Sequence, residues 1–125
     1  MNAYERWGTI LATLAEISDM ERQLVLQAEE PGLFVPDELV DRWFDTFRGG
    51  HGLGALHLSE AIVSTLIEFD FELDDILDVL PEEADDKEAY IRYDEVWSAI
   101  REMADITLRQ LAMLTMPEET LFEAN

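Results

Sequence analysis

The chain has 125 residues, of which 48% are apolar, and its 29 Asp and Glu against eight Lys and Arg give a formal net charge of −21. A chain of this length and apolar content is expected to fold as one domain with a hydrophobic core, which argues against disorder. The charge disfavours direct binding to nucleic acid, whose phosphates repel it, and the absence of cysteine excludes disulfides and thiolate metal sites.

The first residues contain no basic segment followed by an apolar run, and no apolar run approaches the length of a membrane span. We therefore expect a cytoplasmic protein without membrane contact. We also expect a single acidic helical domain over residues 1–116 and a loose tail over residues 117–125.

In the first half of the chain, apolar residues recur every three or four positions and predict one long helix over residues 3–29. Pro36 opens a second helix, with acids in its first turn where the helix dipole favours anions, and Gly49 and Gly50 end it. The glycine-rich segment 49–57 follows no predicted strand and precedes no Gly-Lys-Ser/Thr, so we expect a mobile connector and not a phosphate-binding loop.

Ser59 is a suitable N-cap for a third helix, which an apolar stripe extends to Leu80 before Pro81 ends it. Phe71 lies outside this stripe, so either it meets a second surface or the helix breaks near Asp70. On a helical projection the acids fall on two flanks of the stripe, one formed by Asp70, Asp74 and Asp78 and the other by Glu68, Glu72 and Asp75.

The charged segment after Pro81 predicts a loop that includes, as one option, a short extended piece at Tyr90–Tyr93. Asp94 is the expected N-cap of a last helix that ends near residues 116–117. The fold class predicted is all-α, a four- to five-helix antiparallel bundle. The tryptophans lie on apolar stripes and are expected in its core: Trp7, Trp43 and Trp97.

The stretch Glu68–Glu95 holds 13 of the 29 acids and only two cations, Lys87 and Arg92. Since duplex DNA carries one charge per ~1.7 Å, 21 excess charges match about 36 Å of duplex, and the domain should be roughly 35 Å across. This DNA-like charge density favours a non-enzymatic inhibitor, immunity protein or DNA mimic that blocks a basic, nucleic-acid-handling partner protein. The predicted partner-binding residues are Glu68, Asp70, Glu72, Asp74, Asp75, Asp78, Glu82, Glu83, Asp85 and Asp86.

Calcium binding is the alternative, and calcium is the one cofactor that the sequence leaves open. An EF-hand loop that starts at Asp70 finds Asp75 where the turn glycine belongs and Pro81 where the bidentate glutamate belongs, so that motif is disfavoured. The sequence still allows a calcium site formed by an irregular cluster of carboxylate oxygens. The candidate ligands are Asp37, Asp41, Asp85, Asp86 and Glu88.

Other chemistry finds little support in the sequence. His51 and His57 occur without an HExxH pattern, and Ser59 and Ser64 occur without a GxSxG context, so an enzyme is the least favoured class. A third hypothesis is that the acidity is an adaptation to high salt and has no binding role.

Parts of the chain resemble two families of small acidic proteins. IRYDEVWSAIREMAD (Ile91–Asp105), on a small and very acidic helical chain, resembles part of the phage DNA-mimic antirestriction proteins, which implies DNA mimicry. VPDELVDRW (Val35–Trp43) and DEVWSAIREMA (Asp94–Ala104) are similar to the small acidic calcium-binding proteins of heterocyst-forming cyanobacteria. That resemblance implies calcium held by surface carboxylates, with Asp37 and the loop acids as ligands.

Overall fold

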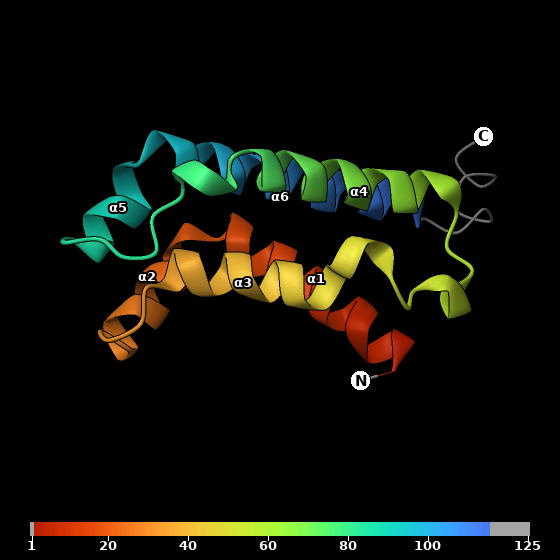
Figure 1. The fold of residues 1–125 in the computed structure, drawn as a ribbon, viewed down its shortest axis with the longest axis horizontal. Helices are drawn as coiled ribbons and strands as arrows, with labels where there is room; N and C mark the ends of the chain where they lie inside the picture. Colours follow the sequence, from red (N-terminus) through yellow and green to blue (C-terminus); the bar gives the residue numbers. More distant parts are fainter. Residues whose placement is uncertain (1, 116–125) are drawn as a thin grey trace.

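The computed structural model describes residues 2–115, which fold into helices without any strand (Figure 1). The α-helices are α1 (Ala3–Ser18), α2 (Met20–Glu29), α3 (Val35–Phe47), α4 (Glu60–Asp75), α5 (Lys87–Tyr93) and α6 (Glu95–Leu114). Three single 3-10 turns are η1 (Arg48–Gly50), η2 (Gly54–Leu56) and η3 (Leu77–Val79). The prediction of an all-α fold is therefore confirmed.

The four longer helices form a two-layered antiparallel bundle (Figure 1). Helices α1 and α3 make one layer, α4 and α6 make the other, and each of these four runs opposite to the one before it. Helix α1 packs against both α3 and α6 and so joins the layers. The short helices α2 and α5 contact each other at the end opposite the glycine-rich segment.

The core lies between the layers and is built around two fully buried tryptophans, Trp43 and Trp97. The Trp43 ring stacks on Phe47 with 4.9 Å between centroids and meets Phe69 edge-on at 4.8 Å, which ties α3 to α4. Trp7 is only partly buried and packs against the edge of this core. The expectation that the tryptophans belong to the core therefore holds fully for two of the three.

The prediction of one helix over residues 3–29 is wrong, because the chain breaks at Asp19 into α1 and α2. Asp19 has extended backbone angles, ends α1 as its C-cap, and accepts a hydrogen bond on its side chain from the Arg22 amide at 3.0 Å. An aspartate in this position satisfies a free amide at the start of a helix, so it stabilises a new start. The helical period of apolar residues continues across the break, which is why periodicity alone missed it.

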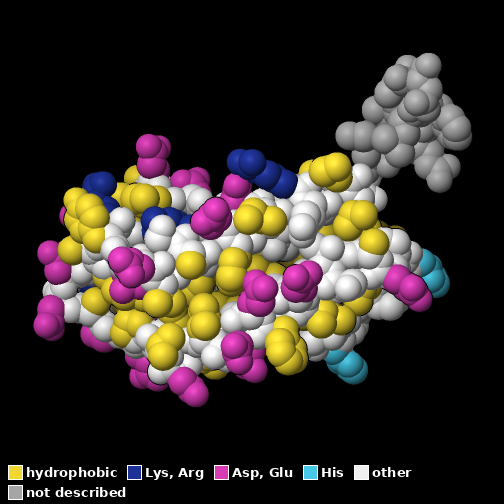
Figure 2. Space-filling model, turned by 90° about the horizontal axis from the view of Figure 1, so that it is seen from above, with side chains coloured by type: hydrophobic (Ala, Val, Ile, Leu, Met, Phe, Trp, Pro, Cys, Tyr) yellow, Lys and Arg dark blue, Asp and Glu magenta, His cyan; other side chains and the backbone are white. Residues whose placement is uncertain are grey.

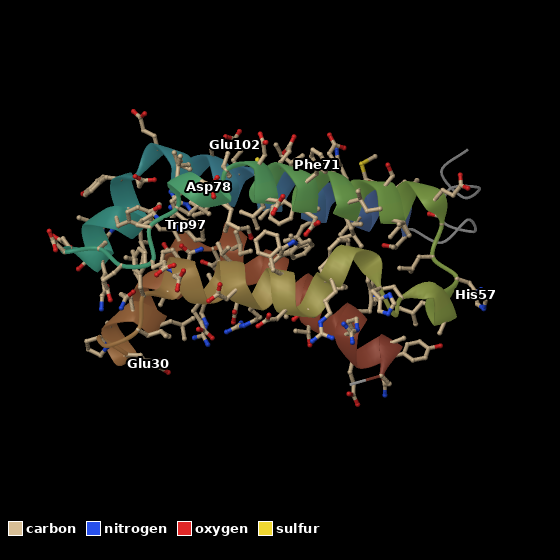
Figure 3. All side chains as sticks on the ribbon, viewed as in Figure 1. Glu30, His57, Phe71, Asp78, Trp97 and Glu102 are labelled. Carbon is tan, nitrogen blue, oxygen red and sulfur yellow. The ribbon has the colours of Figure 1, made fainter. Side chains whose placement is uncertain are left out.

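The third helix is also shorter than expected, since α4 ends at Asp75 and only the turn η3 follows before Pro81. Its C-terminal end carries acids and no cation, and the helix dipole disfavours anions there. The helix is continuous through Asp70, so of the two alternatives given for Phe71 the break near Asp70 is wrong. Phe71 instead points away from the bundle and is 73% exposed (Figure 3).

The extended piece suggested for Tyr90–Tyr93 is wrong as well, because these residues belong to α5. The side chain of Asp86 caps this helix by accepting from the Ala89 amide at 3.0 Å. Asp94 ends α5 and caps α6 through the Trp97 amide at 2.9 Å, which confirms its predicted role. The predicted tail, residues 117–125, lies outside the described residues.

The glycine-rich segment between α3 and α4 is folded into the turns η1 and η2. Leu53 within it is 4% exposed and belongs to the core cluster, which the expectation of a plain mobile connector did not anticipate. In the part of the chain that the structure describes, no helix is both long enough and apolar enough to cross a membrane.

Candidate interaction surface

The negative charge is concentrated in one part of the chain. Residues 49–86, which include η2, α4 and η3, contain eleven acids and neither Lys nor Arg, and so supply more than half of the net charge of −21. Residues 87–115 are nearly neutral, because their five acids are opposed by four cations. Seven of the eleven acids lie on α4 and η3, in the layer that α4 forms with α6 (Figure 1), and the other four lie in the loop before α5.

The first predicted row of acids on α4 faces α3. The carboxylate of Asp70 accepts a hydrogen bond from the indole of the buried Trp43 at 2.9 Å. Burial raises the pKa of Asp70 above its ordinary value, the hydrogen bond from Trp43 opposes this, and the charge of Asp74 adds to the rise. The structure thus gives Asp70 a role in the fold, while Asp74 is exposed.

Asp78 continues this row into a cleft between the start of α3 and η3, about 390 Å³ in volume. Asp37, Asp41 and Glu82 line the same cleft, whose other walls include buried Trp97 (Figure 3). Burial, followed by the charges of Asp41 and Glu82, raises the pKa of Asp37. Four carboxylates from two distant segments therefore line one cleft, which is lined by no cation.

Tyr90 forms another part of the wall of this cleft. Burial and the neighbouring carboxylate of Asp94 raise the pKa of Tyr90 to about 12, so its hydroxyl stays protonated at neutral pH. Its ring packs edge-on against Phe34 with 5.1 Å between centroids. The wall is therefore an uncharged aromatic surface beside the four acids.

The second predicted row faces α6 instead of α3. Glu68, Glu72 and Asp75 line two adjoining hollows along the seam between α4 and α6. Glu95 borders the same seam from the α6 side. The two rows are thus on opposite flanks of α4, as predicted, but they face different neighbouring helices and do not form one continuous patch.

The loop acids form a third group at the end of the bundle. Glu83 pairs with Lys87 at 3.3 Å, and Asp86 is engaged as the cap of α5. Lys87 also donates to the carbonyl of Pro31 at 2.7 Å, which fixes this loop to the end of α2. Of the predicted partner-binding residues in this loop, Glu82 and Asp85 are exposed without such a structural role.

The cations do little to neutralise α4. The ion pairs among residues 2–115 are Arg42–Glu16, Lys87–Glu83, Arg92–Glu88 and Arg109–Asp105. None of these pairs includes a residue of α4. Arg6 and Arg101 donate instead to the backbone carbonyls of Thr46 and Ile91, and burial lowers the pKa of Arg101.

The structure does not assemble the predicted calcium ligands. Asp37 and Asp41 share the cleft, whereas Asp85, Asp86 and Glu88 lie in and after the loop, where Glu88 pairs with Arg92. Within residues 2–115, no three Asp, Glu, His or Cys side chains are arranged to hold a metal ion. The two histidines of the glycine-rich segment are exposed, and His57 lies at the opposite end of the bundle from Asp78 (Figure 3).

Sequence reasoning missed the apolar part of this surface. The outer side of α6 exposes Val96 and Ile106 beside the acids of the seam, and Met113 lies further along the helix at 75% exposure. Ile106 and Met113 fall outside the apolar stripe predicted for the last helix, which was the available signal, whereas Val96 was expected within that stripe and is exposed instead. Figure 2 shows hydrophobic and acidic side chains interspersed over the face made by α4 and α6.

No family model, curated protein or solved structure matches the chain. Its function is therefore inferred from its own residues and their arrangement.

Proposed function

We propose that this protein is a non-enzymatic interaction protein that blocks a basic, nucleic-acid-handling partner through its carboxylate-rich surface. The observation that carries the proposal is the cation-free segment 49–86, whose eleven acids comprise six on α4, Asp78 in η3 and four in the loop at the end of the bundle. Among residues 2–115, only Glu83 of these eleven forms an ion pair.

Uncompensated charge on one side of a small protein raises the rate at which an oppositely charged partner is captured, and it repels partners of like charge. The same surface repels nucleic acid, so the partner is a basic protein and not DNA or RNA itself. A nucleic-acid-binding protein has the positive groove that such a surface fits, which supports the inhibitor, immunity or DNA-mimic class over a generic acidic protein.

The test is a pull-down from lysate of the source organism with two matched double variants. In the first, Asp74→Lys and Asp78→Lys reverse two exposed acids of the proposed surface. In the second, Glu21→Lys and Glu29→Lys make the same change of net charge on α2, outside that surface. The wild type and the α2 variant should capture the same basic nucleic-acid-binding proteins, and the first variant should lose them.

Capture of proteins without basic character would contradict the proposal. Equal loss in the two variants would also contradict it, since binding would then depend on total charge and not on the surface around α4.

Calcium binding is the second candidate function, because Asp37, Asp41, Asp78 and Glu82 line one cleft, although among residues 2–115 no three such side chains are arranged to hold an ion. Oxygen ligands are those calcium prefers, and it accepts irregular arrangements of them. Calorimetric titration at physiological salt tests this, with Asp37→Asn plus Asp41→Asn as the variant. Binding weaker than about 1 mM, or binding unchanged by that variant, would remove the candidate.

A further inference from the structure

A groove runs along the seam between α4 and α6, on the face that Figure 2 shows. It consists of two hollows, of about 450 and 200 Å³, which share Glu72 and Met103 in their walls. Its apolar lining is formed by Phe69, Ile76, Val96, Ala99, Met103 and Ile106. Val96 is 36% exposed and Ile106 47%, so this apolar surface is open to solvent.

Carboxylates border the groove on both sides. Glu68, Glu72 and Asp75 stand on the α4 side, and Glu95 stands on the α6 side. The lining contains neither Lys nor Arg, and none of these four acids takes part in the ion pairs found among residues 2–115. The groove is therefore an apolar channel with three unneutralised carboxylates along its α4 side and one, Glu95, on its α6 side.

We propose that this groove is the docking site for a basic amphipathic helix of the partner protein, an inference that rests on the function proposed above. The apolar face of such a helix covers the channel, and Lys or Arg on its flanks reaches the carboxylates on either side. Most of the negative charge lies on the α4 side and Glu95 lies opposite, so basic residues on both flanks of a helix find a carboxylate.

The dimensions of the groove fit a helix of three to four turns. It extends over residues 65–76, which are the second half of α4 and its C-cap, and over residues 95–110 of α6, which at 1.5 Å per residue is about 17 and 23 Å. A partner helix of about 11–15 residues spans that length.

Other occupants fit the charge of the groove poorly. A second copy of the chain would place the four carboxylates of one groove against the four of the other. The sequence after Thr115 carries three glutamates and neither Lys nor Arg, so the same repulsion applies to it.

The experiment measures binding of a labelled synthetic peptide to the full chain by fluorescence anisotropy. The peptide has about 14 residues of Leu and Lys arranged as an amphipathic helix, and a scrambled peptide of the same composition lacks the apolar face. Ala99→Arg puts bulk and positive charge into the groove, and Ala112→Arg makes the same change on an exposed site of the same helix outside it. Circular dichroism and thermal melting check that both variants fold.

We expect Ala99→Arg to weaken binding of the amphipathic peptide about tenfold or more, whereas Ala112→Arg changes it less than about twofold. The scrambled peptide should bind the wild type more weakly than the amphipathic one. Equal loss in both variants, or equal binding of both peptides, would overturn the groove assignment and leave the proposed function standing.

Two further outcomes count against the inference. If neither basic peptide binds the wild type at low salt, the proposed function fails together with the docking site. If sedimentation shows a dimer that Ala99→Arg abolishes, the occupant is a second copy of the chain and not a partner helix.

Discussion

Replacing Gln23 with leucine should destabilise the protein more than any exposed substitution, because this buried amide joins three elements. Its Nε2 donates to the carbonyls of Glu16 and Ile17 at 2.8 and 2.7 Å, and its Oε1 accepts from the indole of Trp97 at 2.9 Å. Gln23 is fully buried, so water does not replace these bonds without a rearrangement. It therefore connects the last turn of α1 and the start of α2 to α6.

The expected cost follows from these three bonds. Each contributes about 1 kcal/mol net, and a buried donor or acceptor left unpaired costs about 1–3 kcal/mol, so Gln23→Leu should lose about 3–5 kcal/mol of unfolding free energy. For a chain of this length the melting temperature should fall by roughly 10–20 °C. Urea unfolding followed by circular dichroism measures the change, with Gln110→Leu, an exposed residue, as the matched control.

A double-mutant cycle with Trp97→Phe isolates the side-chain pair. The coupling energy between the two substitutions should be about 0.5–3 kcal/mol, since each removes one partner of the same hydrogen bond. A loss below about 1 kcal/mol for Gln23→Leu, or additive effects in the cycle, would refute the role given to this amide.

Three other predictions concern charge and backbone. Asp70→Asn keeps an acceptor for the Trp43 indole and removes the charge. Because the folded-state pKa of Asp70 is raised, the stability of the wild type falls as pH rises above the ordinary aspartate pKa, so the variant should melt higher than wild type at pH 7 and lose this advantage toward pH 3. Asp70→Ala leaves the Trp43 indole N–H without its acceptor and should cost about 1–3 kcal/mol of unfolding free energy. Gly52→Ala should cost about 1–2 kcal/mol because φ is +87° there, whereas Gly54→Ala, with open space around its Cβ, should be neutral in the same unfolding assay. The wild-type melting temperature should rise with NaCl as self-repulsion is screened; a rise that levels off near 0.3 M would contradict adaptation to molar salt, and a steady climb would favour it.

The parts of the fold that the sequence predicted are those set by local rules. The helical period of apolar residues identified the buried face of each long helix, including Ile100 and Leu111 on α6, and the aspartate at position 94 was a recognisable cap. The break at Asp19 was missed because the apolar period continues across it, and because Gln23, which bonds to the end of α1, also bonds to Trp97, 74 positions away. A contact of that range leaves no trace in a local pattern.

For the acidic surface, too, the sequence predicted what depends on a single helix and not what depends on how helices pack. A helical projection correctly assigned the acids of α4 to two flanks, since this depends only on the helix itself. Which neighbour each flank faces depends on the packing of α3 and α6, so neither the bond from Trp43 to Asp70 nor the shared groove of Glu72 and Met103 was visible in the sequence.

Helix α4 is also where charge and folding stability oppose each other. Acids at its C-terminal end oppose the helix dipole, and like charges four residues apart repel by about 0.2–0.5 kcal/mol per pair. Packing of the residues that it buries must offset these costs: Ile62, Leu66, Phe69 and Leu73. Helix α1, in contrast, has a capping box at its N-terminus and an ion pair between Glu16 and Arg42.

This contrast predicts that salt protects α4 selectively. Raising NaCl from about 0.05 to 1 M shortens the Debye length to about 3 Å, which removes repulsion between exposed acids but leaves buried contacts intact. In hydrogen exchange at fixed pH, amides in the last turns of α4, near Asp74, should gain more protection than those of α1. A basic peptide bound to the α4–α6 groove should act in the same direction at low salt. Equal gains in both helices would mean that the charge acts on the whole molecule, and the view of α4 as the segment weakened by its own acids would then be wrong.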